Sequence, residues 1–231
     1  MSVSPIATMF DRISPKYDAI NHLLSFNMDK VWRRRIAKAV VKSHPSTILD
    51  LATGTADLAI ALAKRNPQAH IVGMDISEKM LEIGKEKVTK RGLENQIDLR
   101  AGDAAALPFE GNTFDAVMVA FGVRNFENLD KGLSEIHRVM KPDGKVFILE
   151  FSMPERFPVK QLYRFYFRRV LPKIGKWISK DDNAYAYLPM SVEKFHKPTE
   201  FMDLLASKGW RNGAIQRYTF GIVTKYTAQK G

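Results

Sequence analysis

Residues 48–57 constrain the fold more than any other stretch, because an apolar strand there runs through a tight turn directly into a helix. The first residues of this stretch predict a buried strand, and residues 57–64 begin with a helix-starting acid and continue with good helix formers. Gly54 lets the backbone turn where a side chain would obstruct a ligand. Ligands of open α/β sheets bind at the carboxyl ends of the strands, so this turn is a candidate ligand site. An ordinary strand-to-helix turn would have the same pattern.

Strands and helices alternate from residue 47 onward. Strands are predicted at 48–51, 70–75, 97–101, 114–120 and 144–150, and helices at 57–65, 78–90 and 130–140. An amphipathic helix then begins at residue 197 and ends at Gly209, and strands near 210–216 and 218–226 complete the pattern. Repeated β-α-β units with almost continuously apolar strands predict a parallel sheet that helices cover on both faces. Right-handed crossovers bring the carboxyl ends of these strands to one edge.

Polar residues follow consecutive strands at that edge. Asp75 closes the second strand, about 20 residues beyond the turn, where an acid accepts hydrogen bonds from ribose hydroxyls. Asp103 follows the third strand and could accept a hydrogen bond from an adenine amino group. Each acid alone is equally compatible with a helix cap or a turn. The glycines do not form the GxGxxG of a pyrophosphate-binding turn, so the pattern favours a nucleoside without a pyrophosphate, S-adenosylmethionine (SAM).

The composition limits the classes of protein and site that need to be considered. The chain has 231 residues, 45% of them apolar, and no cysteine, which predicts a single domain over residues 1–231 without disulfides, thiolate catalysis or cysteine-bound metal. The five histidines show no metal-ligand spacing, so no metal is expected. Neither a membrane-spanning run nor a secretion signal is evident, and the composition fits a reducing compartment. The net charge of +11 is compatible with nucleic acid, an anionic membrane surface or solubility alone.

The segment before the first strand, residues 1–45, is predicted to be helical. Pro15 marks a turn within it, and a helix follows over about residues 29–42. Four polar side chains would share one helix face, namely Tyr17, Asp18, Asn21 and His22. That face is compatible with a lid over a site and with an ordinary surface.

A second segment, residues 157–178, interleaves aromatic and basic side chains. It has three interpretations. The segment is compatible with a helix that packs on the sheet with its charges solvated, with a pocket wall that touches anionic lipid, and with a surface that stacks on nucleic acid.

Several motifs over almost the whole chain resemble the UbiE/MenG (Coq5-like) family of SAM-dependent quinone-ring C-methyltransferases. The matching motifs are residues 17–25 continuing to Trp32, residues 121–125, residues 138–145 with 149–152, Leu171 and Pro172 with Gly175, and residues 185–188 with Ser191 and Val192. The chain departs from the family pattern at Ala56 and Asp143, where glycines are usual, and at Asp29, where a histidine is common. Ala120 also lacks a hydroxyl that some relatives offer there. None of these changes removes a group that the chemistry obviously needs.

This resemblance implies an α/β fold of the class I SAM-dependent methyltransferases, a Rossmann-like sheet of seven mostly parallel strands with helices on both faces and an antiparallel last pair. It implies a helical lid over residues 1–45 and an insertion, residues 153–195, that forms the substrate pocket and faces a membrane. By position, the SAM-contacting residues would be Gly54, Thr55, Asp75, Asp103 and Ala104.

The implied substrate is a reduced polyprenyl quinone precursor, either demethylmenaquinol or a methoxy-benzoquinol. The short N-terminus favours menaquinone synthesis, although some relatives serve both pathways. Methylation of a quinol carbon requires that a ring hydroxyl, with a pKa near 10, ionises. We expect Arg124 to stabilise the phenolate as a fixed positive charge, and Tyr17 to position the oxygen or relay a proton. Asn125 is a further catalytic candidate, and Asn21 and His22 are weaker ones.

The expected partners are the polyprenyl quinol and, transiently, an anionic membrane surface, with a homodimer as one compatible state and no nucleic acid. The expected location is cytoplasmic and peripheral at the inner face of the membrane. Two alternatives remain at the level of sequence: a SAM-dependent methyltransferase of another lipid-like small molecule, and a basic nucleic-acid-binding protein with a methyltransferase fold.

Overall fold

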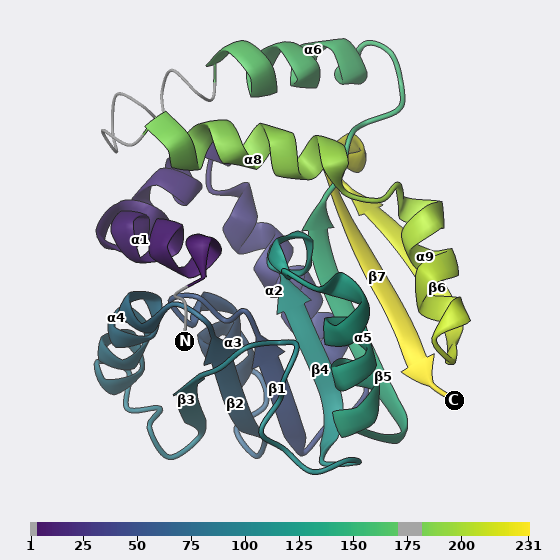
Figure 1. The fold of residues 1–231 in the computed structure, drawn as a ribbon. Helices are drawn as coiled ribbons and strands as arrows, with labels where there is room; N and C mark the ends of the chain where they lie inside the picture. The colour runs from purple at the N-terminus through teal and green to yellow at the C-terminus, as the bar shows by residue number, and fades with distance from the viewer. Residues whose placement is uncertain (1–3, 171–181) are drawn as a thin grey trace.

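A seven-stranded sheet in the order β3-β2-β1-β4-β5-β7-β6 forms the centre of the computed structural model, which describes residues 4–170 and 182–231 (Figure 1). The strands are β1 (Thr47–Leu51), β2 (His70–Asp75), β3 (Ile97–Ala101), β4 (Phe114–Ala120), β5 (Met140–Phe151), β6 (Trp210–Tyr218) and β7 (Val223–Lys230). Strands β1 to β5 pair in parallel, whereas β7 pairs antiparallel with both β5 and β6. The chain order reverses between β1 and β4, which makes their carboxyl ends the expected ligand-binding edge.

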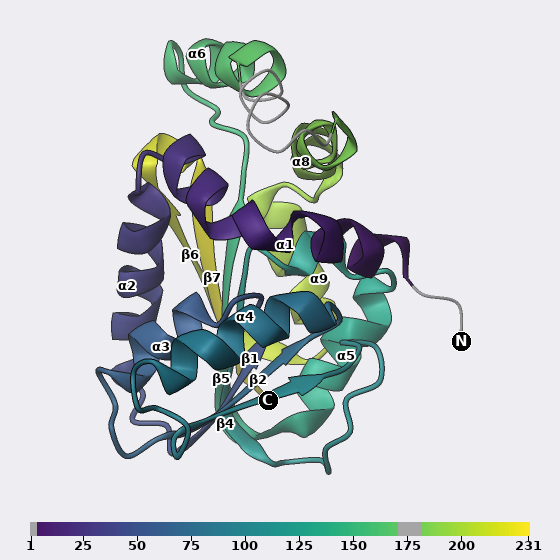
Figure 2. The same ribbon diagram turned by 90° about the vertical axis from the view of Figure 1, so that its left-hand side faces the viewer.

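Helices cover both faces of the sheet (Figure 2). On one face lie α2 (Met28–Val41), α3 (Asp57–Ala63) and α4 (Glu78–Thr89), and on the other α5 (Leu129–Val139) and α9 (Pro198–Ser207). Consecutive strand residues serve the two faces in turn, since Ile48 packs with α2 and α3 whereas Leu49 packs in the core that contains α5 and α9. The expected class I fold with helices on both faces and an antiparallel last pair is confirmed.

The predicted end of the sheet was wrong in its bounds. Tyr218 ends β6 instead of starting the last strand, and β7 begins only at Val223. The chain reverses through the short 3-10 turn η3 (Thr219–Gly221), whose three residues all have positive φ angles of 47°, 58° and 91°. Backbone in this region cannot continue a strand.

The turn predicted at Pro15 does not exist, because Pro15 lies inside the single helix α1 (Pro5–Leu24). A proline in a helix leaves the carbonyl four residues earlier without its usual N–H donor. Here that carbonyl is the one of Asp11, and it accepts a hydrogen bond from the Ser14 hydroxyl at 3.0 Å. Ile13 and Ile20 on either side of the proline are buried, so packing also favours the continuous helix.

Above the carboxyl edge of the sheet lie α6 (Val159–Phe165), the π-helical turn η2 (Tyr166–Val170) and α8 (Asp182–Lys194) (Figure 1). Together with α1 they form a third apolar cluster that contains Ile13, Tyr163 and Phe167. Of the segment expected to touch lipid, residues 171–178 lie outside the described residues. None of the helices within residues 4–170 and 182–231 combines the length and the apolar character that crossing a bilayer requires.

Candidate active site

Two adjoining cavities lie beneath α1 and beside the carboxyl ends of the central strands. The smaller one, here the rim cavity, has a volume of about 80 Å³, and its lining includes Gly54, Asp75, Asp103, Ala104 and Asn125. Four of the five predicted SAM-contacting residues, and two of the three predicted catalytic residues (Tyr17 and Asn125), therefore line the same space.

Backbone hydrogen bonds fix the Asp75 side chain in the rim cavity. The Asp75 carboxylate accepts hydrogen bonds from the backbone N–H of Gly54 at 2.7 Å and from that of Ser77 at 2.9 Å. Each carboxylate oxygen has a second lone pair that can accept a ligand hydroxyl. Burial raises the pKa of Asp75, and these backbone hydrogen bonds oppose that shift.

Glycines allow the turns around this cavity to approach one another. Gly54 has a φ of +57°, a conformation that L side chains rarely adopt. At Gly122, which follows β4, a Cβ atom would lie 2.4 Å from the Cβ of Ala52, so only glycine permits this close packing of two strand ends. Apolar residues such as Ile76 and Met80 complete the lining. Carboxylates beside an apolar shelf fit a nucleoside, which presents hydroxyls at one end and a flat ring at the other.

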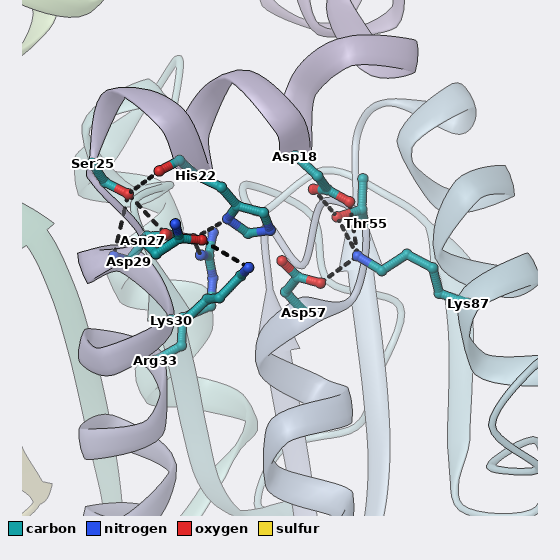
Figure 3. Close-up of polar contacts among 10 residues, drawn as sticks. All are labelled: Asp18, His22, Ser25, Asn27, Asp29, Lys30, Arg33, Thr55, Asp57 and Lys87. Atoms are coloured by element: carbon teal, nitrogen blue, oxygen red, sulfur yellow. Dashed lines mark hydrogen bonds and ion pairs between the residues drawn. The ribbon is translucent and has the colours of Figure 1, made fainter.

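Thr55, the fifth predicted SAM contact, does not line the rim cavity. Its hydroxyl donates to Asp18 of α1 at 2.7 Å and accepts from the Lys87 ammonium at 3.0 Å (Figure 3). Lys87 also forms ion pairs with Asp18, at 2.9 Å, and with Asp57 at the start of α3. Thr55 therefore belongs to a network that joins α1, α3 and α4 around the turn after β1.

Further contacts hold α1 over the rim cavity. The Asp11 carboxylate accepts from the Ser77 hydroxyl at 2.6 Å and from the backbone N–H of Lys79 at 3.3 Å. At the other end of the helix segment that covers the cavity, the Ser4 hydroxyl donates to Glu127. These contacts fix α1 across the rim cavity, and the lid remains a prediction for residues 1–45.

The larger cavity, here the apolar cavity, has a volume of about 390 Å³ and is enclosed by α1, α2, α6, η2 and α8. Its walls are mostly aromatic and aliphatic, and Trp32, Phe121 and Phe151 pack against one another in them with ring centroids 4.6 to 6.2 Å apart. Three residues, Phe10, Tyr17 and Phe121, line both cavities. Two ligands bound in the two cavities would therefore lie next to each other at these three residues, the shared wall.

Tyr17 is the polar member of the shared wall. Burial raises the pKa of its hydroxyl, although the nearby Arg33 and Arg124 guanidinium groups act in the opposite direction. The hydroxyl is therefore protonated near neutral pH and can donate a hydrogen bond. Its expected role, positioning a substrate oxygen, stays a prediction.

Arg124 lines the apolar cavity but is not an isolated charge. Its guanidinium forms an ion pair with Glu150 at 2.7 Å, and its backbone N–H donates to the same carboxylate at 3.3 Å. Both side chains are buried, with 7% and 0% of their surface exposed. Burial raises the pKa of Glu150, and the Arg124 charge opposes that shift. The sequence argument missed Glu150, although an acid at the carboxyl end of an apolar strand was a usable signal.

Helix α8 contacts both candidate catalytic residues of the 3-10 turn η1 (Val123–Asn125). The Arg124 Nε donates to the Ser191 hydroxyl at 3.2 Å, and the Tyr187 hydroxyl donates to the Asn125 side-chain oxygen at 3.0 Å. The turn that carries these two candidates is therefore joined to one wall of the apolar cavity.

A second charged cluster surrounds Asp29, which lines the apolar cavity. Its carboxylate pairs with Arg33, with His22 Nδ1 at 2.8 Å and with the Ser25 hydroxyl at 2.7 Å (Figure 3). Burial alone would raise the pKa of Asp29, but Arg33, Ser25 and His22 together lower it. Asn21 lines the apolar cavity, whereas His22 does not, so the four residues predicted to share one polar face have different surroundings. Within the described ranges, no three histidine or acidic side chains converge as metal ligands would.

The chain is similar to known proteins over nearly its full length. The model of the ubiE/COQ5 methyltransferase family matches residues 2–230. A demethylmenaquinone methyltransferase of Bacteroides fragilis is 44% identical over 97% of this chain and 92% of its own. The ubiquinone/menaquinone biosynthesis C-methyltransferase UbiE of Geobacter sulfurreducens is 45% identical over 98% of this chain and 88% of its own.

Solved structures share the fold at lower identity. A SAM-dependent methyltransferase of Thermotoga maritima superposes with a TM-score of 0.70 at 15% identity, covering 98% of this chain and 100% of its own. A second, from Aquifex aeolicus, has a TM-score of 0.62 at 21% identity, covering 84% and 89%.

Proposed function

The chain belongs to the ubiE/COQ5 methyltransferase family, and we propose that its substrate is demethylmenaquinol, which it methylates at a ring carbon to give menaquinol. It is a SAM-dependent C-methyltransferase of quinone biosynthesis. One observation carries the assignment of the two sites: a rim cavity suited to a nucleoside shares the wall of Phe10, Tyr17 and Phe121 with an apolar cavity suited to a prenylated ring.

In the rim cavity, we assign Asp75 to the ribose hydroxyls and Asp103 and Ala104 to the adenine end, with Gly54 leaving room at the turn. Thr55 acts indirectly, by tying α1 to the turn through Asp18. When bound, SAM supplies an electrophilic methyl group on a sulfonium.

In the apolar cavity, the chain must favour the ionised form of a ring hydroxyl. Tyr17 donates a hydrogen bond to the phenolate oxygen, and Arg124 stabilises its negative charge from the cavity wall. The phenolate raises the electron density of the adjacent ring carbon, which becomes the nucleophile. A bond from this carbon to the methyl group would form as the sulfur–methyl bond breaks and leaves a neutral thioether, and the methylated carbon then loses its proton as aromaticity returns. A guanidinium stays protonated near neutral pH and has no acceptor for a proton, so it cannot act as the base, and the protons leave through water. The apolar walls exclude other water from the ring.

The pairing of Arg124 with Glu150 refines the role assigned to the arginine. A guanidinium whose charge a buried carboxylate already balances attracts a phenolate less than a free one does. The carboxylate in turn holds the guanidinium at the cavity wall, so that hydrogen-bond donation from a fixed position contributes together with the charge.

We further propose that the mouth of the apolar cavity rests on a membrane. Large apolar side chains are exposed around it, namely Phe26, Phe157, Leu162, Phe165 and Phe220. Phe26 and Leu162 also line the cavity, and Arg164, Arg168 and Arg169 are exposed on the same segment. Exposed aromatic residues beside arginines suit the surface of an anionic bilayer, from which a polyprenyl tail could enter the cavity.

Methyl transfer from labelled SAM tests the substrate. The purified chain is incubated with dithionite-reduced demethylmenaquinol or methoxy-benzoquinol, using wild type, Arg124→Ala and, as a matched control, Arg217→Ala at an exposed ion pair. We expect transfer to demethylmenaquinol that Arg124→Ala abolishes and Arg217→Ala leaves intact. Transfer to the benzoquinol alone would refute the substrate assignment, and full activity of Arg124→Ala would refute the role of Arg124.

Vesicle sedimentation tests the membrane contact. Replacing Arg164, Arg168 and Arg169 by glutamate should release the chain from vesicles that contain phosphatidylserine. The same reversal at three exposed lysines, Lys79 and Lys85 of α4 and Lys90 directly after it, should not. Equal binding of wild type and the first variant would exclude this surface.

A further inference from the structure

A third concave surface, here the cationic groove, lies between α2 and the strands β5, β7 and β6. Its volume is about 620 Å³, and none of its lining residues lines the rim cavity or the apolar cavity. Five of its lining residues are cationic, namely Arg35, Lys38, Lys42, Lys145 and Lys225, and none of the described lining residues is acidic. The groove therefore holds five positive charges of a chain whose net charge is +11.

The two walls of the groove present these charges to each other. Arg35 and Lys38 of α2 and Lys42, the residue that caps its C-terminus, follow at intervals of three and four residues. They form one stripe about 10 Å long on one side of the helix. Lys145 of β5 and Lys225 of β7 lie on the sheet side. An extended ligand in the groove would have cations on both flanks.

In the part of the chain that the structure describes, these five cations share the absence of an acidic partner. Several lysines and arginines elsewhere form ion pairs, as Lys141 does with Asp115 and Lys208 with Asp130. Among the side chains described, those of residues 4–170 and 187–231, no carboxylate forms an ion pair with any of the five groove cations. At the end of the groove near Lys145, the Asp143 carboxylate accepts from Gln229, a lining residue, but does not itself line the groove.

The half-buried Lys225 makes the arrangement unfavourable in the absence of an anion. Burial lowers the pKa of its ammonium, and the positive charge of Lys42 lowers it further. Like charges that approach one another without a counter-charge oppose folding. A surface that keeps such a cluster is suited to a ligand that supplies the missing negative charge.

We propose that the cationic groove binds a small polyphosphate anion, one with at least three negative charges along a chain of linked phosphates. Beside the cations, its lining offers neutral hydrogen-bond donors in Asn212, Gln216 and Thr227. Phosphate oxygens accept hydrogen bonds from ammonium, guanidinium and amide groups alike. A linear triphosphate could lie along α2 with cations on both sides.

Calorimetric titration of the full chain with inorganic tripolyphosphate tests the proposal. The decisive variant is the double substitution Lys38→Gln with Lys225→Gln, which removes one charge from each wall. Its control is Lys79→Gln with Lys85→Gln on α4, two exposed lysines for which the structure gives no ion pair. Both variants change the net charge from +11 to +9, since each removes two lysines.

We expect saturable binding that weakens about 100-fold in the groove variant, about tenfold for each lost charge-assisted contact, and less than about twofold in the control. We also expect Lys225→Gln alone to raise the urea midpoint of the free chain while it weakens tripolyphosphate binding, because it relieves repulsion with Lys42. Methyl transfer should persist in both double variants, so the outcome is independent of the proposed reaction.

Equal losses in the two double variants would reduce the binding to overall charge and overturn the proposal. So would the absence of tripolyphosphate binding, with or without binding of phosphatidylserine vesicles or of a single-stranded RNA in parallel titrations. A nucleoside triphosphate that competes with tripolyphosphate would support the same site and identify a carrier of the phosphate chain.

Discussion

Replacing Glu150 by glutamine isolates what holds Arg124 at the wall of the apolar cavity. Glutamine has the shape of glutamate, and its amide oxygen can still accept from the Arg124 guanidinium and from the backbone N–H of Phe151, which lies 2.8 Å from the same carboxylate oxygen. The second oxygen, which accepts from the backbone N–H of Arg124 at 3.3 Å, becomes an NH₂ group. The substitution therefore removes one negative charge and places two hydrogen-bond donors, the new NH₂ group and the backbone N–H of Arg124, opposite each other.

The expected loss of stability follows from the burial of the pair. Removing one partner of a buried ion pair costs about 3–5 kcal/mol, because the other charge stays buried without compensation. Glutamine keeps part of the hydrogen bonding, so we expect the free energy of unfolding to fall by about 3 kcal/mol, the lower end of that range. The matched control is Glu155→Gln, which breaks an exposed pair with Arg217 and should cost less than about 1 kcal/mol.

Urea unfolding followed by circular dichroism measures both variants, and a double-mutant cycle with Arg124→Met completes the test. The double variant Arg124→Met with Glu150→Gln should be less destabilised than the sum of the single variants, because no charge is left unpaired. Strictly additive effects, or a Glu150→Gln variant as stable as Glu155→Gln, would refute the inference that the carboxylate fixes Arg124. Methyl transfer by Glu150→Gln should decrease mainly in kcat, since the rim cavity is untouched.

Three other substitutions probe separate features of the fold. Burial raises the pKa of Asp50 to about 7, although the hydrogen bond from Thr53 acts in the opposite direction. The free energy of unfolding of the wild type should therefore fall as pH rises from about 4 through 7. Asp50→Asn cannot ionise, so its free energy of unfolding, measured with urea at each pH, should rise relative to that of the wild type over this window. A difference that is constant with pH would contradict the burial argument. Asp143 has a φ of 62° on the surface, so Asp143→Gly should raise the urea-derived free energy of unfolding by about 0.5 kcal/mol, and a loss would contradict it. Asp18→Asn removes the ion pair with Lys87, so SAM binding measured by calorimetry should weaken about fivefold, and unchanged affinity would show that α1 does not act as a lid.

The alternating pattern of the chain was sufficient to predict the sheet and its ligand-binding edge. Strand and helix periodicity, and the positions of Gly54 and Asp75, are local properties, and a parallel sheet brings its strand ends together whatever the details of packing. The tendency of proline to break helices, also a local rule, gave the wrong result at Pro15, because Ser14 supplies the missing hydrogen bond and the flanking isoleucines are buried. Family motifs added the reaction class, which periodicity alone does not contain.

By itself, then, the sequence determined the strand order along the chain, the edge at which polar residues gather and the family. Only the tertiary structure decided which side chains meet. Thr55 faces Asp18, 37 residues earlier, instead of the rim cavity, and Arg124 pairs with Glu150, 26 residues later. The cationic groove likewise combines Lys38 of one helix with Lys225 of a strand near the other end of the chain. Such pairings depend on the register and packing of elements that are distant in sequence, whereas the strand pattern depends only on neighbouring residues.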